Sequence, residues 1–146
     1  MLGSAITRML KTFDDFGGVF PADKICELVQ GKFYVLNSKP SNHPGEHWVA
    51  VYLSEVPEFF DSLGHSPEYY ASGFEELLID HGPMYMYNTR RLQNYGSSAC
   101  GHFCIYYIIS RMKGNCIREI VEKFAQYDMS ANDEKVVKFY NKFAKG

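Results

Sequence analysis

The sequence predicts an α+β fold, with a small mixed β-sheet clasped by helices. Two patterns support this class. Apolar residues alternate with other residues along His47–Leu53, as in a strand, and they recur every three or four residues along Cys100–Met112, as in a helix. The chain has 146 residues, of which 46% are hydrophobic, so we expect one domain over residues 1–146 with a core of its own.

The N-terminal part is expected to open with an amphipathic helix over Ser4–Phe13. A second helix is predicted over Pro21–Val29, because proline suits the first turn and Gly31 is a stop signal. A strand at Lys32–Leu36 follows. Two prolines and a glycine then predict a loop over Ser38–Gly45.

The middle of the chain predicts an antiparallel strand pair, His47–Leu53 and Glu58–Asp61, joined by a short turn over Ser54–Pro57. A helix is expected to start at Ser66–Pro67–Glu68 and to end at His81–Gly82–Pro83. Gly73 interrupts this helix, which predicts that it is split.

The C-terminal half predicts one more short strand, Tyr85–Tyr87, followed by helices. The apolar spacing places these helices at Cys100–Met112, Ile117–Gln126 and Asn132–Phe143. No internal repeat or low-complexity segment interrupts the pattern.

Composition narrows the function classes. A net charge of −2 and a pI near 6.2 give no support for general polyanion binding. No apolar run approaches the length of about 18 residues that a membrane span requires, and nothing resembles a signal peptide. We therefore expect an intracellular protein, in a virion interior, nucleus or cytoplasm, with reduced thiols.

Cys100 is the candidate nucleophile because it opens an apolar helix. A free thiol has a pKa of about 8.5, so an attacking cysteine needs neighbours that stabilise its thiolate. The unpaired N–H groups of the first helical turn favour an anion. The larger effect is expected from His47, which as an imidazolium would pair with the thiolate and later protonate a leaving amine.

Asp61 and Gln93 complete the predicted catalytic set. A carboxylate at Asp61 would orient the second nitrogen of the histidine ring, although Asp-Ser-x-Gly is also ordinary turn chemistry. Gln93, seven residues before Cys100, would donate to the oxyanion together with the backbone N–H of Cys100. Gly101 has no side chain that would block a substrate backbone, which makes it a candidate substrate-binding residue.

These residues carry a resemblance to a known family. The order His47-Trp48, Phe59-Phe60-Asp61-Ser62, Gln93 and Cys100-Gly101-His102-Phe103-Cys104 resembles the adenovirus-type maturation cysteine proteases (adenain-like). These enzymes belong to a papain-like clan that also contains the proteases of SUMO and other ubiquitin-like proteins. Ala99 stands where the ubiquitin-like branch has Asp, which favours the adenoviral branch and its relatives in large DNA transposons and viruses.

The resemblance implies a thiol endopeptidase that cleaves viral or transposon-encoded structural precursors at small-residue, Gly-containing sites. Trp48 would form an aromatic wall beside the substrate, which would be a protein or peptide. Activation by a peptide or by DNA is implied by the resemblance only. Two departures stand out: the chain is shorter than the adenoviral enzyme, and Asp61 stands where that enzyme has Glu.

Two other functions stay open: a SUMO-type protease, and a catalytically silent capsid- or DNA-binding module of the same fold. No cofactor is predicted. The cysteines are not arranged as paired Cys-x-x-Cys, so no metal site is predicted. The sequence predicts no oligomeric state.

Other chemistry-bearing residues are given structural roles. We expect core positions for Cys26, Cys104 and Cys116. We expect loop or surface positions for His43, His65, His81 and His102. Most tyrosines are expected in the core, although a role in a peptide groove stays open for Tyr69, Tyr70, Tyr85 and Tyr87.

Overall fold

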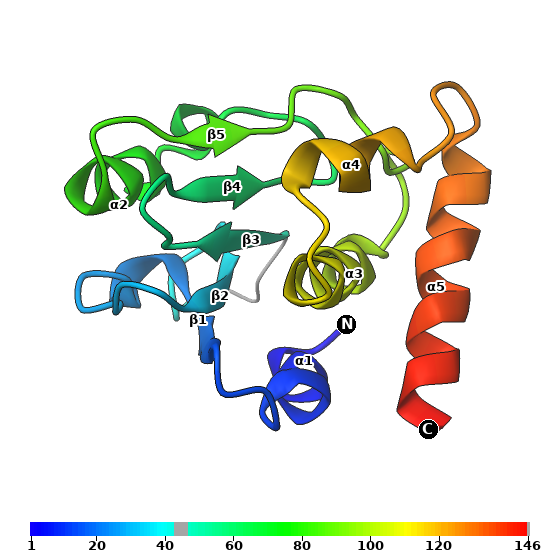
Figure 1. Ribbon diagram of the computed structural model, residues 1–146, viewed down its shortest axis with the longest axis horizontal. Helices are drawn as coiled ribbons and strands as arrows, with labels where there is room; N and C mark the ends of the chain where they lie inside the picture. Colours follow the sequence, from blue (N-terminus) through cyan, green and yellow to red (C-terminus); the bar gives the residue numbers. More distant parts are fainter. Residues whose placement is uncertain (43–46, 146) are drawn as a thin grey trace.

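The structure is a computed structural model, and it describes residues 1–42 and 47–145. Within these residues, five strands form one mixed sheet in the order β1-β2-β3-β4-β5 (Figure 1). The predicted α+β class is confirmed. The strands are β1 (Phe16–Phe20), β2 (Phe33–Asn37), β3 (Trp48–Tyr52), β4 (Glu58–Phe60) and β5 (Met86–Tyr87).

Helices cover both faces of this sheet. Across the described part of the chain, no helix has the length and apolar character needed to cross a membrane. The α-helices are α1 (Gly3–Leu10), α2 (Phe74–His81), α3 (Cys100–Met112), α4 (Ile117–Glu122) and α5 (Met129–Lys145). Two short 3-10 helices are η1 (Ala22–Lys24) and η2 (Pro67–Tyr70).

The predicted antiparallel pairing of β3 with β4 is confirmed. β2 and β4 both lie antiparallel to β3, whereas the edge strands β1 and β5 lie parallel to β2 and β4. In the β2–β3 pair, Asn37 lies opposite Trp48, and the N–H of Ser38 donates to the carbonyl oxygen of His47 at 2.9 Å. His47 therefore stands directly before β3, where the pairing with β2 ends.

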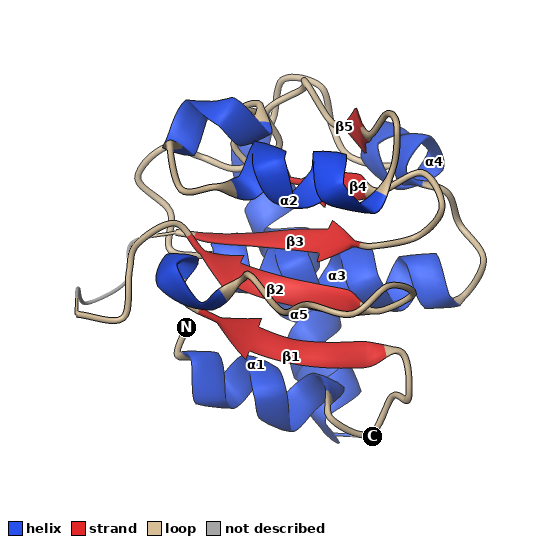
Figure 2. Cartoon of the chain, turned by 90° about the vertical axis from the view of Figure 1, so that its left-hand side faces the viewer, coloured by secondary structure: helices blue, strands red, loops and turns tan. Residues whose placement is uncertain are grey.

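Both faces of the central strands are buried, because alternate side chains enter different cores. Phe33 and Val35 of β2 pack into the core around α3, while Tyr34 and Leu36 pack into the core under α2. Figure 2 shows α2 in front of the sheet and α3 behind it.

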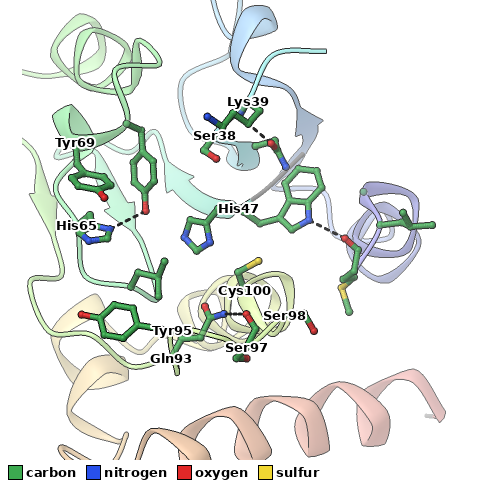
Figure 3. Close-up of a pocket in the computed structure, with 17 residues that line it drawn as sticks. Ser38, Lys39, His47, His65, Tyr69, Gln93, Tyr95, Ser97, Ser98 and Cys100 are labelled. Atoms are coloured by element: carbon green, nitrogen blue, oxygen red, sulfur yellow. Dashed lines mark hydrogen bonds between the residues drawn. The ribbon is translucent and has the colours of Figure 1, made fainter. Parts of the chain in front are cut away.

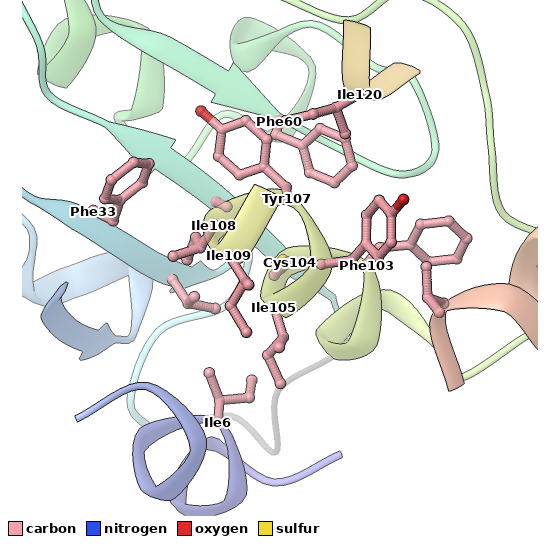
Figure 4. Packing of buried hydrophobic residues seen from close by; sticks show 14 of the residues in the cluster. Ile6, Phe33, Phe60, Phe103, Cys104, Ile105, Tyr107, Ile108, Ile109 and Ile120 are labelled. Carbon is pink, nitrogen blue, oxygen red and sulfur yellow. The ribbon is translucent and has the colours of Figure 1, made fainter. Parts of the chain in front are cut away.

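Helix α3 is the central helix of the larger core. It contacts β3, α1, α4 and α5, and most of its residues are buried. Such a helix is apolar on nearly all sides rather than along one stripe. Figure 4 shows its side chains between Phe33 and Phe60 of the sheet and Ile6 of α1. This packing holds the N-terminal residue of α3 against the start of β3.

The helix predicted over Pro21–Val29 is wrong, since only the single turn η1 forms there. The competing interaction is a hydrogen bond from the N–H of Val29 to the hydroxyl of Tyr34, at 2.8 Å. This side-chain acceptor replaces the carbonyl four residues earlier that a helix would provide. Ile25 and Leu28 pack against the core under α2 from this irregular segment.

Strand β1 was not predicted, because Gly17 and Gly18 lower the strand propensity of Phe16–Phe20. The structure explains one of these glycines. A Cβ at Gly17 would lie 2.3 Å from a ring carbon of Tyr34 on the neighbouring strand. The ring of Tyr34, which occupies the space that a side chain would need, therefore accounts for the glycine.

The remaining elements follow the prediction with shifted ends. The interruption at Gly73 is confirmed, since η2 and α2 are separate and Gly73 has φ +80°. The helix predicted over Ile117–Gln126 ends early, at Glu122, and the last helix begins early, at Met129. The second half of the predicted loop Ser38–Gly45, including His43, lies outside the described residues.

Candidate active site

Cys100 is the first residue of α3, and its side chain faces the start of β3 (Figure 3). The hydroxyl of Ser97 accepts a hydrogen bond from the N–H of Ala99, at 3.0 Å, and so orders the approach to the helix. The thiol is therefore placed at the positive end of a long buried helix, where an anion is favoured.

His47 and Asp61 form a buried pair beside this thiol. His47 Nε2 lies 2.6 Å from Asp61 Oδ1, and Asp61 is fully buried. Because Nε2 is engaged by the carboxylate, Nδ1 is the ring nitrogen left to hydrogen-bond the thiol of Cys100. The result is a continuous chain of carboxylate, imidazole and thiol.

The surroundings of these three side chains favour a charged pair of His47 and Cys100. Burial opposes the charge on His47, but hydrogen bonds to Asp61 and Cys100 more than offset it and raise the pKa of His47 to about 9. Burial also opposes ionisation of Cys100. The hydrogen bond and charge of His47, together with the backbone N–H groups of Trp48 and Gly101, nevertheless lower the pKa of the thiol. The two groups therefore shift in the directions that favour a thiolate and imidazolium pair.

Asp61 is held by more donors than the sequence indicated. Its Oδ1 also accepts from the N–H of Leu63 at 3.0 Å, and its Oδ2 accepts from the N–H of His65 at 3.2 Å and from the hydroxyl of Tyr70. Burial opposes the carboxylate charge, but the bonds from His47, Tyr70 and Leu63 prevail and lower the pKa of Asp61. The carboxylate is therefore ionised when it meets the histidine ring.

Two contacts at the site were not predicted from the sequence: that of Tyr70, considered only for a peptide groove, with Asp61 and His47, and that of His65 with the same carboxylate. The ring of Tyr70 stacks on that of His47, with centroids 5.8 Å apart and planes at 21°. His65 was expected in a loop or at the surface, yet its ring is only half-exposed and lies against Tyr69 and Tyr70. The usable signal was weak: His65 lies four residues after Asp61, within the turn that Asp-Ser-x-Gly forms.

Gln93 lies next to Cys100 and is almost fully buried. Its Nε2 donates to the carbonyl oxygen of Ser97 at 2.8 Å, and its Oε1 accepts from the hydroxyl of Ser62 at 2.5 Å. The amide nitrogen carries two hydrogens, so one remains for another acceptor. Gln93 thus lines the same cavity as Cys100 and His47, with one amide hydrogen that Ser97 does not use.

A cavity of about 830 Å³ opens over Cys100, His47 and Gln93. Trp48 lines it, as predicted, and its indole N–H donates to the carbonyl oxygen of Met1 at 3.0 Å. The wall is otherwise formed by residues from four parts of the chain, which are Met1, Leu2, Gly3, Asn37, Ser38, Lys39, Leu63, His65, Tyr69, Tyr70, Tyr95, Ser97 and Ser98. An extended peptide fits a groove of this size.

The place predicted for Gly101 needs correction. Gly101 does not belong to the cavity wall; a Cβ there would lie 3.1 to 3.3 Å from Met1 and Ile6. Its lack of a side chain lets α1 approach α3, while its N–H is directed at the sulfur of Cys100. Close helix packing, rather than access for a substrate backbone, accounts for this glycine.

Other expectations can be compared with the structure. Cys104 is buried as predicted, whereas the core positions predicted for Cys26 and Cys116 are wrong, because both residues are exposed. Across the described residues, no three His, Cys, Asp or Glu side chains are grouped as metal ligands. His102 is half-buried on α3 and packs edge-on against Tyr140, rather than lying in a loop.

The four tyrosines considered for a peptide groove divide into two pairs. Tyr69 and Tyr70 line the cavity, and Tyr69 is well exposed. Tyr85 and Tyr87 lie on the far side of the sheet edge, outside the cavity wall. Of the four, Tyr69 and Tyr70 are therefore the pair that lines the cavity.

No protein-family model matches the sequence, and no curated protein matches it. Two solved structures share the fold, each with a TM-score of 0.54 and 18% sequence identity. One is the ASFV pS273R protease; the alignment covers 95% of this chain and 65% of that one. The other is the central domain of the uncharacterized protein Lpg1148 from Legionella pneumophila; the alignment covers 98% of both chains.

Proposed function

We propose that the protein is a cysteine endopeptidase in which Cys100 is the nucleophile and His47 is the general acid and base. The observation that carries the proposal is the buried chain from Asp61 through His47 to Cys100, in which the pKa of the imidazole is raised and that of the thiol is lowered. A structural cysteine in a core has no need of an ionised neighbour, and burial alone would raise its pKa.

The first half of the proposed reaction forms an acyl-enzyme. The thiolate of Cys100 attacks the carbonyl carbon of the scissile amide, and a C–S bond forms. The oxyanion accepts hydrogen bonds from the free N–H of Gln93 and from the backbone N–H of Cys100. His47 then passes its Nδ1 proton to the amide nitrogen, the C–N bond breaks, and the amine leaves.

The second half releases the other product. Neutral His47 takes a proton from water, and the hydroxide attacks the thioester carbonyl through the same oxyanion site. The C–S bond breaks, a carboxylic acid leaves, and the thiolate and imidazolium pair is restored. Asp61 keeps the ring in the tautomer and orientation that both halves require.

For the substrate, we propose small-residue, Gly-containing sites in structural precursor proteins of viral or transposon origin. Two facts support this choice: the fold is shared with the ASFV pS273R protease, and Trp48 stands in the cavity wall next to His47. A bulky indole beside the reacting carbonyl leaves little room for a large side chain there.

Thiol labelling tests the activated pair. Iodoacetamide at about pH 6 to 7 should modify Cys100 faster than the exposed Cys26 and Cys116, which serve as internal references, and this preference should vanish in His47→Ala. Equal, slow labelling of these cysteines would contradict the proposal and favour a silent binding module.

Peptide cleavage tests the reaction itself. Cys100→Ala and Cys100→Ser should abolish cleavage of a peptide library without changing the circular dichroism of the domain. Cleavage by the alanine variant would remove the proposal. The library should include Gly-containing sites, and ubiquitin-like precursors should be assayed beside it, because preferential cleavage of a folded precursor would replace the proposed substrate with a SUMO-type one.

A further inference from the structure

We infer that Ser62 is a positioning residue that fixes the oxyanion donor Gln93; this inference rests on the proposed function. Ser62 is fully buried and does not line the cavity, so it acts through another residue. Its hydroxyl lies 2.5 Å from Gln93 Oε1, and its carbonyl oxygen accepts from the backbone N–H groups of Leu92 and Gln93 at 2.8 and 3.1 Å. Both the backbone and the side chain of Gln93 are thus bound to one serine.

These contacts determine which way the amide of Gln93 faces. The carbonyl oxygen of Ser97 can only accept, so the atom 2.8 Å from it must be the NH₂ group of Gln93. Oε1 therefore faces Ser62, and because Oε1 can only accept, the serine hydroxyl must donate. With both ends of the amide engaged, its second N–H has a fixed direction in the cavity that Cys100 also lines.

Without the serine hydroxyl, the Gln93 amide loses the hydrogen bond that fixes this orientation. Oε1 of Gln93 would be left buried with no donor, a situation that proteins avoid because the group was desolvated on folding. Rotation of the Gln93 amide toward another hydrogen-bond donor would then lower its free energy, and the N–H directed at the oxyanion would move with it. An oxyanion donor must already be in place before charge develops.

Ser62 also ties this donor to the catalytic pair. It follows Asp61 directly. Asn88 holds the backbone of Asp61, because its Oδ1 accepts from the N–H of Asp61 at 3.0 Å and its Nδ2 donates to the carbonyl oxygen of Asp61 at 2.6 Å. Asp61 is directed at His47 and Ser62 is directed at Gln93. One dipeptide at the end of β4 therefore sets the position of the proton carrier and of the oxyanion donor relative to each other.

The test compares two reactions of the same thiol. Acylation by p-nitrophenyl acetate forms a C–S bond, passes through an oxyanion and expels p-nitrophenolate. Alkylation by iodoacetamide displaces iodide at a saturated carbon and forms no oxyanion. Both rates are measured at Cys100 by mass spectrometry of the full chain, so that the exposed Cys26 and Cys116 do not contribute. The ratio of acylation to alkylation reports oxyanion stabilisation whatever the natural substrate is.

Ser62→Ala should lower this ratio by about tenfold or more, while Gln93→Ala should lower it by about 10² to 10³-fold, as expected for the loss of one oxyanion donor. The double variant should lower it no further than Gln93→Ala alone, because Ser62 acts only through Gln93. Ser62→Thr, which keeps the hydroxyl, should retain most of the ratio. Ser110→Ala, which removes another buried hydroxyl far along α3, is the matched control and should leave it unchanged.

Two outcomes overturn the inference: a ratio in folded Ser62→Ala equal to that of the wild type, or losses from Ser62→Ala and Gln93→Ala that multiply in the double variant. The first outcome includes equal slowing of both reactions by Ser62→Ala, which would leave the ratio unchanged and show that the serine acts on the ion pair instead. Failure of the proposed function would look different, since Cys100 would then show no preferential alkylation even in the wild type.

Discussion

Replacing Asp61 with asparagine should remove most of the positive charge on His47 and, with it, the stabilisation of the Cys100 thiolate. The rise in the pKa of His47 from 6.5 to about 9 corresponds to about 3 kcal/mol of preference for the charged ring. The hydrogen bond to Asp61 is the largest contribution that favours the charge, and burial opposes it. Without the carboxylate, we expect the pKa of His47 to return to about 6.5 or lower.

The size of the effect follows from these values. At about pH 7.5, nearly all of the wild-type rings are charged, whereas about a tenth would be charged with a pKa of 6.5. Loss of the imidazolium also raises the pKa of Cys100, so the thiolate population falls as well. Together these losses predict acylation of Cys100 that is slower by about 10²-fold in Asp61→Asn.

The sign of the pH dependence can be measured directly. Ultraviolet absorbance of the thiolate, recorded between about pH 5 and pH 10, should show the wild-type thiolate appearing at lower pH than the Asp61→Asn thiolate, because His47 lowers the pKa of Cys100. Asp80→Asn, a change at an exposed carboxylate of α2, should behave as the wild type. An unchanged titration curve in a folded Asp61→Asn variant would refute the reasoning.

Three further perturbations test other parts of the structure. Tyr70→Phe removes the hydroxyl that donates to Asp61 but keeps the ring on His47. It should slow acylation by about tenfold and move the acid limb of the pH profile to higher pH. An unchanged profile would show that this hydrogen bond does not affect the reaction. Glu58→Ala leaves the guanidinium of Arg111 without its buried partner and should lower the free energy of unfolding by about 3 kcal/mol in urea denaturation; a loss near zero would mean that water replaces the carboxylate. Gly101→Ala places a methyl group against α1 and should cost about 1 to 3 kcal/mol in the same assay, whereas an effect on substrate KM alone would restore the groove role first predicted for this glycine.

The sequence was most informative where a local pattern changes. Cys100 opens a helix, His47 directly precedes a strand and Asp61 directly follows one, so each stands at a boundary that apolar periodicity reveals. Helix α3 was predicted with its observed ends for the same reason. The positions of these residues relative to one another follow from strand pairing and helix packing, which the order of elements alone does not determine.

What was missed depends on contacts between distant segments. Tyr70 reaches Asp61 only because the chain turns back after Gly64, and no periodic pattern records that return. The Pro21–Val29 segment has a helical start signal, but the hydroxyl of Tyr34 competes for its backbone. Cys26 and Cys116 are exposed although cysteine is usually buried, since residue type is only a weak guide to the depth of a single position.

The split origin of the thiol and the imidazole has a consequence for the nascent chain. Cys100 and His47 come from different layers of the fold, and they meet only when α3 has docked on the sheet. Until then, the cysteine is an ordinary sulfhydryl with no cationic neighbour. A polypeptide emerging from the ribosome, or one that has been denatured, would therefore lack the reactive thiolate. The nucleophilicity of Cys100 is acquired only when the tertiary structure is complete.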